Sequence, residues 1–121
     1  MHAVGVNALD QLASWIGEML ARHMLDVGDA VVVVLNADRR IVLLNQAATR
    51  LGWDRECAVG RSWADFARPH DSVPVRVAAD AHRRPYDVRL GDGSWVRLDC
   101  VSYTGNVEPY GTVSVLVIDP G

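Results

Sequence analysis

The sequence predicts an α+β domain in which short helices cover an antiparallel sheet. Two observations predict it: an amphipathic stretch at 7–25 precedes a β-hairpin pattern at 30–44, and alternating apolar and charged residues at 86–100 indicate further strands. Between them lie short segments with helix-capping residues, without the regular strand–helix alternation of a parallel sheet. The 121 residues fit one such domain.

Composition excludes several classes of protein. Half of the residues are apolar and 22% are charged, which argues against disorder. The longest apolar run, at 30–35, is far shorter than the roughly 20 residues of a membrane helix, and the N-terminus lacks the features of a secretory signal. A net charge of -3 does not favour nucleic-acid binding. Cys57 and Cys100 form no metal or redox motif and favour a reducing cytoplasmic location.

The first predicted element is a helix over 7–25 that Asn7 can cap. Apolar residues recur on it at spacings of three and four, so one face needs cover from the domain itself or from a second copy of the helix. This pattern makes the helix the expected homodimer interface. The residues assigned to that interface are Leu9, Leu12, Trp15, Ile16, Met19 and His23.

The next segment is predicted as a hairpin over 30–44, with its first strand apolar on both faces and therefore central in the sheet. Asn45 can cap a short helix at 46–51, and Gly52 is placed to end it in the left-handed conformation.

Short capped turns are predicted after that helix. Asp54 can cap a turn that runs through Cys57, and Gly60 makes the next bend. Ser62 can cap a further turn that carries Trp63 and Phe66.

A longer helix is predicted at 72–82, with Asp71 as its cap, because Val73, Val77 and Ala81 recur at intervals of four. We expect this helix and the short helices to cover one sheet face, while the N-terminal helix covers the other.

The C-terminal part is predicted to be β. Strands are expected at 86–90, 96–100 and 112–118, with a tight connection at 91–94 and a loop at 104–110. Charged residues that alternate along the first two strands are expected to pair across them. These residues are Asp87, Arg89, Arg97 and Asp99.

These segments together resemble the PAS domain family. Four strings carry the resemblance in order: DAVVVVLNAD from Asp29, RIVLLNQAA from Arg40, LGWDRE from Leu51 with the Val-Gly pair that ends at Gly60, and DGSW from Asp92. The resemblance implies a five-stranded antiparallel sheet with helices across one face. It divides the chain into a flanking helix at 1–27 and a PAS-like domain at 28–121.

The resemblance also implies a function in signal transduction. Such domains sense a small molecule, light, oxygen or redox state, or dimerise, and pass that state to an effector such as a histidine kinase, a cyclase or a transcription regulator of a two-component system. Asn45 and Gly60 match structural positions of the family. The segment 71–84 is short for the family's longest helix, which normally forms a wall of the ligand pocket. The chain is expected to be a stand-alone domain or an N-terminal piece.

Candidate ligand contacts follow from the resemblance. Trp63, Phe66 and Leu98 are expected around a cavity, although the first two also suit a simple core. His70 and His82 flank the short segment where haem-binding relatives carry their iron ligand, but such histidines are more often ordinary polar residues. Flavin-adduct chemistry would need a cysteine within an Asn-Cys-Arg-Phe-Leu-Gln string, which is absent. The cofactor therefore stays unknown.

An enzyme is the distant alternative. The sequence contains no nucleophile elbow, phosphate loop, zinc-protease or dinucleotide motif. A carboxylate base would have to be Asp65, Asp71 or Asp99, and each suits a helix cap or a strand surface. We therefore expect a dimeric sensory domain that is not an enzyme, with a ligand-free dimerisation module as the alternative.

Overall fold

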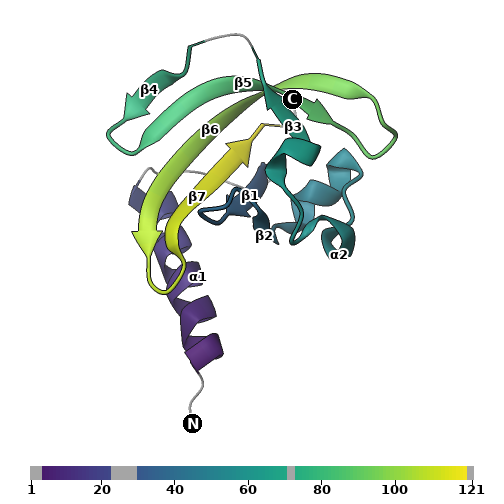
Figure 1. The fold of residues 1–121 in the computed structure, drawn as a ribbon. Helices are drawn as coiled ribbons and strands as arrows, with labels where there is room; N and C mark the ends of the chain where they lie inside the picture. Colours follow the sequence, from purple (N-terminus) through teal and green to yellow (C-terminus); the bar gives the residue numbers. More distant parts are fainter. Residues whose placement is uncertain (1–3, 23–29, 71–72, 120–121) are drawn as a thin grey trace.

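The computed structural model describes residues 4–22, 30–70 and 73–119 and shows one curved sheet with helices on both sides (Figure 1). One long helix lies against one face, and short helices lie under the other. The elements are α1 (Val4–Arg22), β1 (Val31–Leu35), β2 (Ile41–Leu44), η1 (Gln46–Leu51), α2 (Arg55–Ala58), η2 (Trp63–Asp65), β3 (Ala67–Pro69), β4 (Val75–Ala78), β5 (Ala81–Arg89), β6 (Trp95–Val107) and β7 (Gly111–Ile118).

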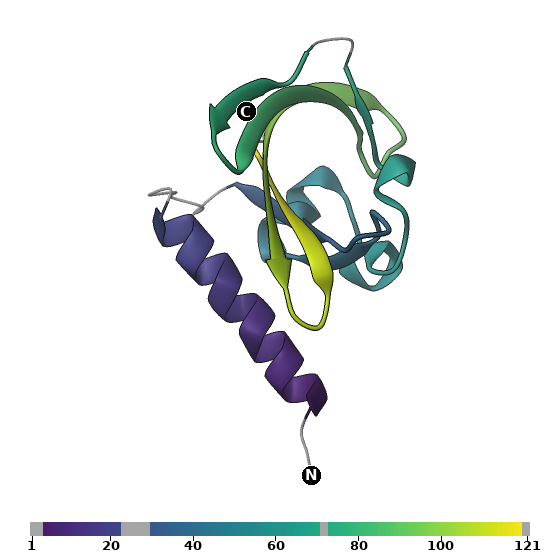
Figure 2. The same ribbon diagram turned by 60° about the vertical axis from the view of Figure 1, so that its left-hand side comes forward.

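The sheet is antiparallel and has the order β2-β1-β7-β6-β5-β3, with β4 also paired to β5. The antiparallel α+β class is therefore confirmed, but the described chain has seven strands where five were expected. Figure 2 shows β5 and β6 arching over the short helices, which gives the sheet a concave side. Below, the concave face means the side on which the short helices lie.

The central position of β1 is confirmed. All five of its residues are buried, and it pairs with β2 on one side and β7 on the other. Because side chains alternate along a strand, Val31 and Val33 enter the core on the concave face, whereas Val32 and Val34 enter the core beneath α1.

The helix predicted at 72–82 is wrong: within its described residues, 73–82, the chain forms β4 and the start of β5. Residues spaced by four lie on one side of a helix, but they also lie on one side of a strand, so the spacing of Val73, Val77 and Ala81 fits both. Val75 continues the alternation and favours the strand. The proposed cap, Asp71, lies outside the described residues.

The loop predicted at 104–110 is also shorter than expected. Strand β6 continues to Val107 and pairs with β7 down to Gly111. Tyr103 and Val107 are buried, so the strand continues through the polar Thr-Gly-Asn stretch because its flanking residues pack under α1. The strand propensity of the Thr-Gly-Asn residues themselves does not predict this packing.

The predicted turn chemistry is largely confirmed. Asp54 and Ser62 cap α2 and η2 by accepting hydrogen bonds from backbone amides, and Gly52 ends η1 with φ 80°. Asn45 precedes η1 but makes no side-chain cap. Instead its Oδ1 accepts a hydrogen bond from the Val32 amide at 3.0 Å, and its Nδ2 donates to the Ala30 carbonyl at 2.9 Å. Asn45 therefore holds β1 to the segment that follows β2.

Helix α1 covers the face of the sheet opposite the short helices, as expected. Leu12 is 2% exposed and Met19 is fully buried, and both pack against residues of β1, β6 and β7. The indole ring of Trp15 lies over Gly105 of β6 so closely that a Cβ there would overlap it. The helix observed at 4–22 begins before the predicted 7–25, and residues 23–25 lie outside the described residues.

Candidate functional site

The predicted ligand contacts Trp63 and Phe66 come together on the concave face, where aromatic rings form a continuous cluster. The ring centroids of Trp53 lie 5.9 Å from those of Trp63 and 5.1 Å from those of Phe66, and Trp63 lies 6.0 Å from Tyr86. Leu98, the third predicted apolar contact, faces Tyr86 across β5 and β6 and packs against the same core. The predicted apolar set is thus brought to one place.

Trp53 is a member of this cluster that sequence reasoning missed. It lies just before α2, is 4% exposed, and its indole nitrogen donates a 2.7 Å hydrogen bond to the Arg89 carbonyl. The string LGWDRE contained it, but the local pattern gave no sign that its ring would reach β5.

Two buried nitrogens of the concave face have no hydrogen-bond partner in the described structure: Nε1 of Trp63 and Nε of Arg84. Trp63 is only 3% exposed, so its indole N–H has also lost water. Another nitrogen of the same guanidinium group, Nη2 of Arg84, donates a long hydrogen bond of 3.4 Å to the His70 carbonyl. Buried polar groups in proteins are nearly always paired, so two orphaned donors on one face are notable.

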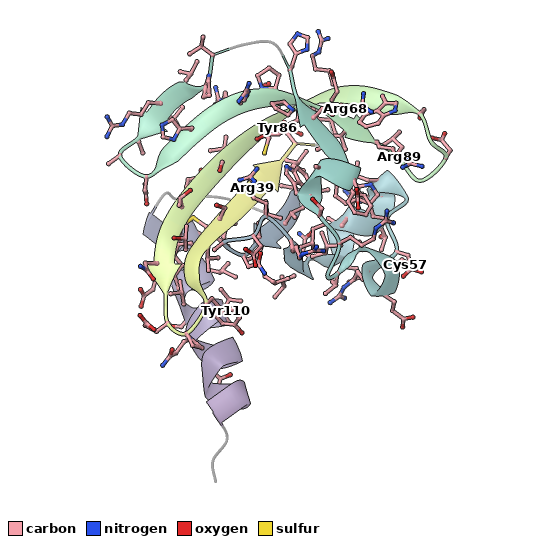
Figure 3. All side chains as sticks on the ribbon, in the orientation of Figure 1. Arg39, Cys57, Arg68, Tyr86, Arg89 and Tyr110 are labelled. Atoms are coloured by element: carbon pink, nitrogen blue, oxygen red, sulfur yellow. The ribbon has the colours of Figure 1, made fainter. Side chains whose placement is uncertain are left out.

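A second arginine, Arg39, reaches the same face from the β1–β2 turn. Its backbone has φ 61°, and its carbonyl accepts a 2.9 Å hydrogen bond from the Trp63 amide. Its charge acts on Cys100 of β6, whose side chain is buried. Figure 3 shows Arg39 and Tyr86 on the inner side of the arch.

The pKa of the Cys100 thiol depends on its burial and on the charges near it. Burial raises its pKa to about 12, and the nearby Arg39 guanidinium partly opposes that rise. Cys100 also faces Arg84 across β5 and β6. Arg84 is thus the strand neighbour of Cys100, whereas Arg39 and Asp99 are the charges that act on its thiol.

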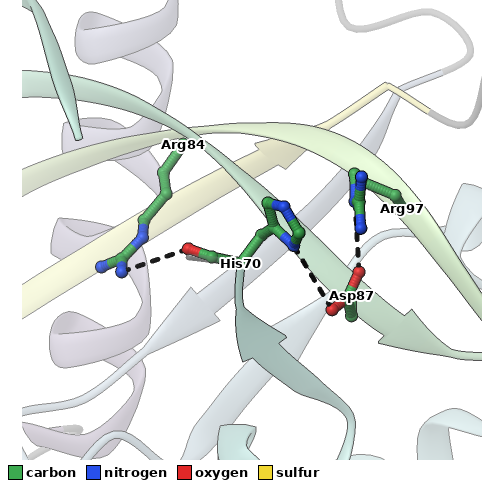
Figure 4. A network of polar contacts seen from close by, with 4 residues as sticks. All are labelled: His70, Arg84, Asp87 and Arg97. Atoms are coloured by element: carbon green, nitrogen blue, oxygen red, sulfur yellow. Dashed lines mark hydrogen bonds and ion pairs between the residues drawn. The ribbon is translucent and has the colours of Figure 1, made fainter. Parts of the chain in front are cut away.

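The two candidate histidines occupy different surroundings. His70 Nδ1 lies 3.7 Å from Asp87 Oδ2, and Asp87 Oδ1 lies 3.5 Å from Arg97 Nε (Figure 4). This contact confirms the expected pairing of Asp87 with Arg97. His82 is exposed on β5, opposite Ser102. Among the described residues, no cluster of three or more His, Cys, Asp or Glu could hold a metal ion.

The other expected cross-strand pairing is not formed, because the register places Arg89 opposite Trp95 and Asp99 opposite Pro85. In place of such an ion pair, Arg68 of β3 stacks on Trp95, with its guanidinium carbon 4.4 Å from the ring centroid.

A separate small pocket of about 220 Å³ opens between the short helices and the β5–β6 turn. Its wall includes Trp53 and Phe66, while Cys57 and Arg61 lie at its polar side. Arg61 is already paired with Asp65 at 3.3 Å. Ligand pockets usually exceed about 300 Å³, so this one is small for an organic ligand.

The candidate carboxylate bases are dispersed. Asp65 is the ion-pair partner of Arg61, and Asp99 is exposed on β6. Asp71 lies outside the described residues.

The residues predicted for a dimer interface divide into three groups. Leu12 and Met19 are buried against the sheet of their own chain, and Trp15 and Ile16 are half-buried beside them. The position of the Leu9 side chain and the whole of His23 lie outside the described residues. No helix among the described residues has the length and apolarity needed to cross a membrane.

Comparison with known proteins identifies the fold. A family model described as the PAS fold matches residues 25–89. The PAS domain of an HTR-like protein from Haloarcula marismortui aligns with a TM-score of 0.62 and 20% identity, covering 85% of this chain and 97% of that one. No curated protein matches the chain in sequence.

Two further structures come from a nitrogen regulation protein and from a sensor histidine kinase. The PAS domain of nitrogen regulation protein NR(II) from Vibrio parahaemolyticus aligns with a TM-score of 0.54 and 14% identity, covering 83% of this chain and 96% of that one. A PAS domain from a two-component sensor histidine kinase aligns with a TM-score of 0.57 and 13% identity, covering 88% and 97%.

Proposed function

The chain belongs to the PAS fold family, whose members are sensory modules rather than enzymes, and on that premise we propose that it binds a small molecule on the concave face and passes the bound state to an effector through α1. A histidine kinase, a cyclase or a transcription regulator is the proposed class of effector, attached or separate. Similarity to the PAS domain of a two-component sensor histidine kinase supports the first of these.

The observation that carries this proposal is that the same strands contribute side chains to both cores, one on the concave face and one under α1. On β6, Cys100 enters the core of the concave face, whereas Tyr103 enters the core under α1. The concave face holds the aromatic cluster and the orphaned donors, and the opposite face holds the helix. A ligand that shifts β5 or β6 therefore changes the surface on which α1 rests.

The contact between α1 and β6 is well suited to such a relay. Trp15 lies directly over Gly105, so a small movement of the strand changes the space available to the ring. Met19, fully buried, anchors the helix one turn further along. Packed cores respond to such shifts by moving between discrete arrangements, which is how a local change reaches a distant element.

Native mass spectrometry and an absorbance spectrum of freshly purified protein test the binding part. We expect an added mass that is lost on denaturation, and the spectrum identifies the ligand as haem, flavin or a colourless compound. A bare-chain mass, together with no response to a small-molecule library, would contradict ligand sensing.

A ligand-free homodimer is the second candidate, and one observation favours it. Ala13, Ile16 and Leu20 form an apolar flank along α1 that the sheet leaves partly or wholly exposed. Sedimentation velocity of Ala13→Glu against the matched control Gln11→Glu, on the other side of the helix, tests this flank without disturbing the buried Leu12. The dimer proposal expects dissociation only for Ala13→Glu, and a wild type that is monomeric at micromolar concentration would refute it.

A further inference from the structure

We infer that the ligand of the concave face is a small organic acid, whose carboxylate is held by Arg84, Arg39 and the indole N–H of Trp63. This inference rests on the proposed ligand-sensing function and names the chemical class of the ligand. It is carried by two buried donors on one face that have no acceptor in the described structure, together with the charge of Arg39, an exposed residue of the adjoining β1–β2 turn.

The first step is the unsatisfied hydrogen bonding. Nε1 of Trp63 and Nε of Arg84 are both buried without a partner, and both can only donate. The missing partner is therefore an acceptor. The Trp63 ring stacks edge-on against Tyr86, which lies two residues from Arg84 on the same side of β5, so the two donors belong to neighbouring positions.

The second step is the charge. The charge of Arg39 acts on the Cys100 thiol, and Arg84 is the residue paired with Cys100 across β5 and β6. The acidic residues of the same strands, Asp87 and Asp99, alternate with Tyr86 and with Cys100 and so point to the other face. On β5 and β6 the concave side thus carries Arg84 but no carboxylate, although the charge of Asp99 also acts on the Cys100 thiol from the other side. Together with Arg39 at the adjoining turn, this arrangement favours an anion.

The third step is the choice of anion. A guanidinium binds a planar carboxylate through two parallel hydrogen bonds, and an indole N–H can add one more to the same oxygen. The rings and side chains beside the donors, Tyr86 and Leu98, are apolar and half-buried. Such surroundings suit the carbon skeleton of an organic acid better than a fully hydrated inorganic ion.

The probe is phenylacetate, with its neutral isostere phenylacetamide as the matched ligand, and the readout is the set of indole N–H signals in ¹⁵N–¹H correlation spectra of the full chain. The Trp63 signal is assigned with Trp63→Phe. We expect phenylacetate, but not phenylacetamide, to move that signal as its N–H gains a charged acceptor. Equal shifts with both compounds, or no shift of the Trp63 signal, would overturn the inference.

Variants of β5 supply the control. Arg84→Gln should weaken phenylacetate binding roughly tenfold or more because a charge-assisted hydrogen bond is lost. Arg83→Gln, the neighbouring arginine on the opposite face, should leave binding unchanged. Equal weakening by both variants would show that only the general charge matters and would refute the assigned site.

Further measurements cover a variant that does not fold and separate an organic acid from an inorganic anion or a neutral ligand. If Arg84→Gln does not fold, Arg39→Gln in the exposed β1–β2 turn makes the same test. Inorganic phosphate that moves the Trp63 signal at lower concentration than phenylacetate would overturn the organic-acid class. A neutral compound that binds the concave face would refute this inference while leaving the proposed function intact, whereas a library without any binder, acidic or neutral, would contradict both.

Discussion

Replacing Asn45 by alanine tests how the sheet is held to the helical layer. The side chain makes two hydrogen bonds to the backbone at the start of β1, at 3.0 Å from the Val32 amide and 2.9 Å to the Ala30 carbonyl. Each such bond contributes about 1 kcal/mol net, and a partly buried donor left unpaired adds a further penalty of about 1 kcal/mol. We therefore expect Asn45→Ala to lower the free energy of unfolding by about 3 kcal/mol.

Urea unfolding followed by circular dichroism measures this loss. With a slope of about 1.5 kcal/mol per molar urea, a loss of about 3 kcal/mol lowers the midpoint by about 2 M. Asn45→Asp keeps an acceptor for Val32 but places a carboxylate against the Ala30 carbonyl, so it should also destabilise. The neighbouring exposed residue gives the control Gln46→Ala, expected within about 0.5 kcal/mol of wild type. If Asn45→Ala is as mild as Gln46→Ala, the reasoning is refuted.

Three other perturbations test the packing on either side of the sheet. Met19→Ala should cost about 2–5 kcal/mol because Met19 is fully buried under α1, whereas the exposed Glu18→Ala should cost less than about 0.5 kcal/mol in the same urea titration. Gly105→Val should displace the tryptophan ring above it and cost about 1–3 kcal/mol, and an unchanged melting temperature and tryptophan emission would contradict that contact. A thiol reagent at pH 8 should label Cys57 alone in the folded chain, because burial raises the pKa of Cys100 from 9.0 to about 12. The stabilisation from the protonated Cys100 thiol should be complete below pH 9 and decline as the pH rises from 9 towards 12, a decline that Cys100→Ala should lessen if this thiol causes it.

The elements that could be predicted from sequence are those whose signals are local. The β-branched run of β1, the cap at Asp54 and the left-handed Gly52 each follow from one or two neighbouring residues, and each is confirmed. The antiparallel sheet with a helical layer followed from the order of the predicted elements, and the family resemblance implied the same fold. Asn45 was expected as a helix cap, but it bonds to β1, since its partners lie 13 and 15 residues away.

The segment 72–82, which was predicted as a helix, shows where local signals are ambiguous. Val73, Val77 and Ala81 satisfy the periods of both a helix and a strand, and the pairing of β4 with β5 decides between them. That pairing depends on β5 being held by β6, a contact between segments about 18 residues apart at Arg83 and Val101. A pattern within one window does not contain this information.

Only part of the candidate site could be predicted, because its other residues are also brought together by contacts between distant segments. Trp63, Phe66 and Leu98 were expected from the family resemblance, and the structure brings them together. Arg84 and Arg39 each stand beside a second arginine in the sequence, a pattern typical of a solvated surface, so nothing local marked them as site residues. Their relation to Cys100 depends on the register of β5 with β6 and on the turn after β1.

The measurement that tests the central claim most directly is a map of backbone amide shifts when a panel of small organic acids and neutral isosteres is added to the full chain. A ligand that binds the concave face and acts through the sheet should shift amides of β5 and β6 around Arg84 and Cys100, and also amides of α1 near Trp15. Shifts confined to the small pocket beside Cys57, or shifts on β5 and β6 that leave α1 unchanged, would contradict the account.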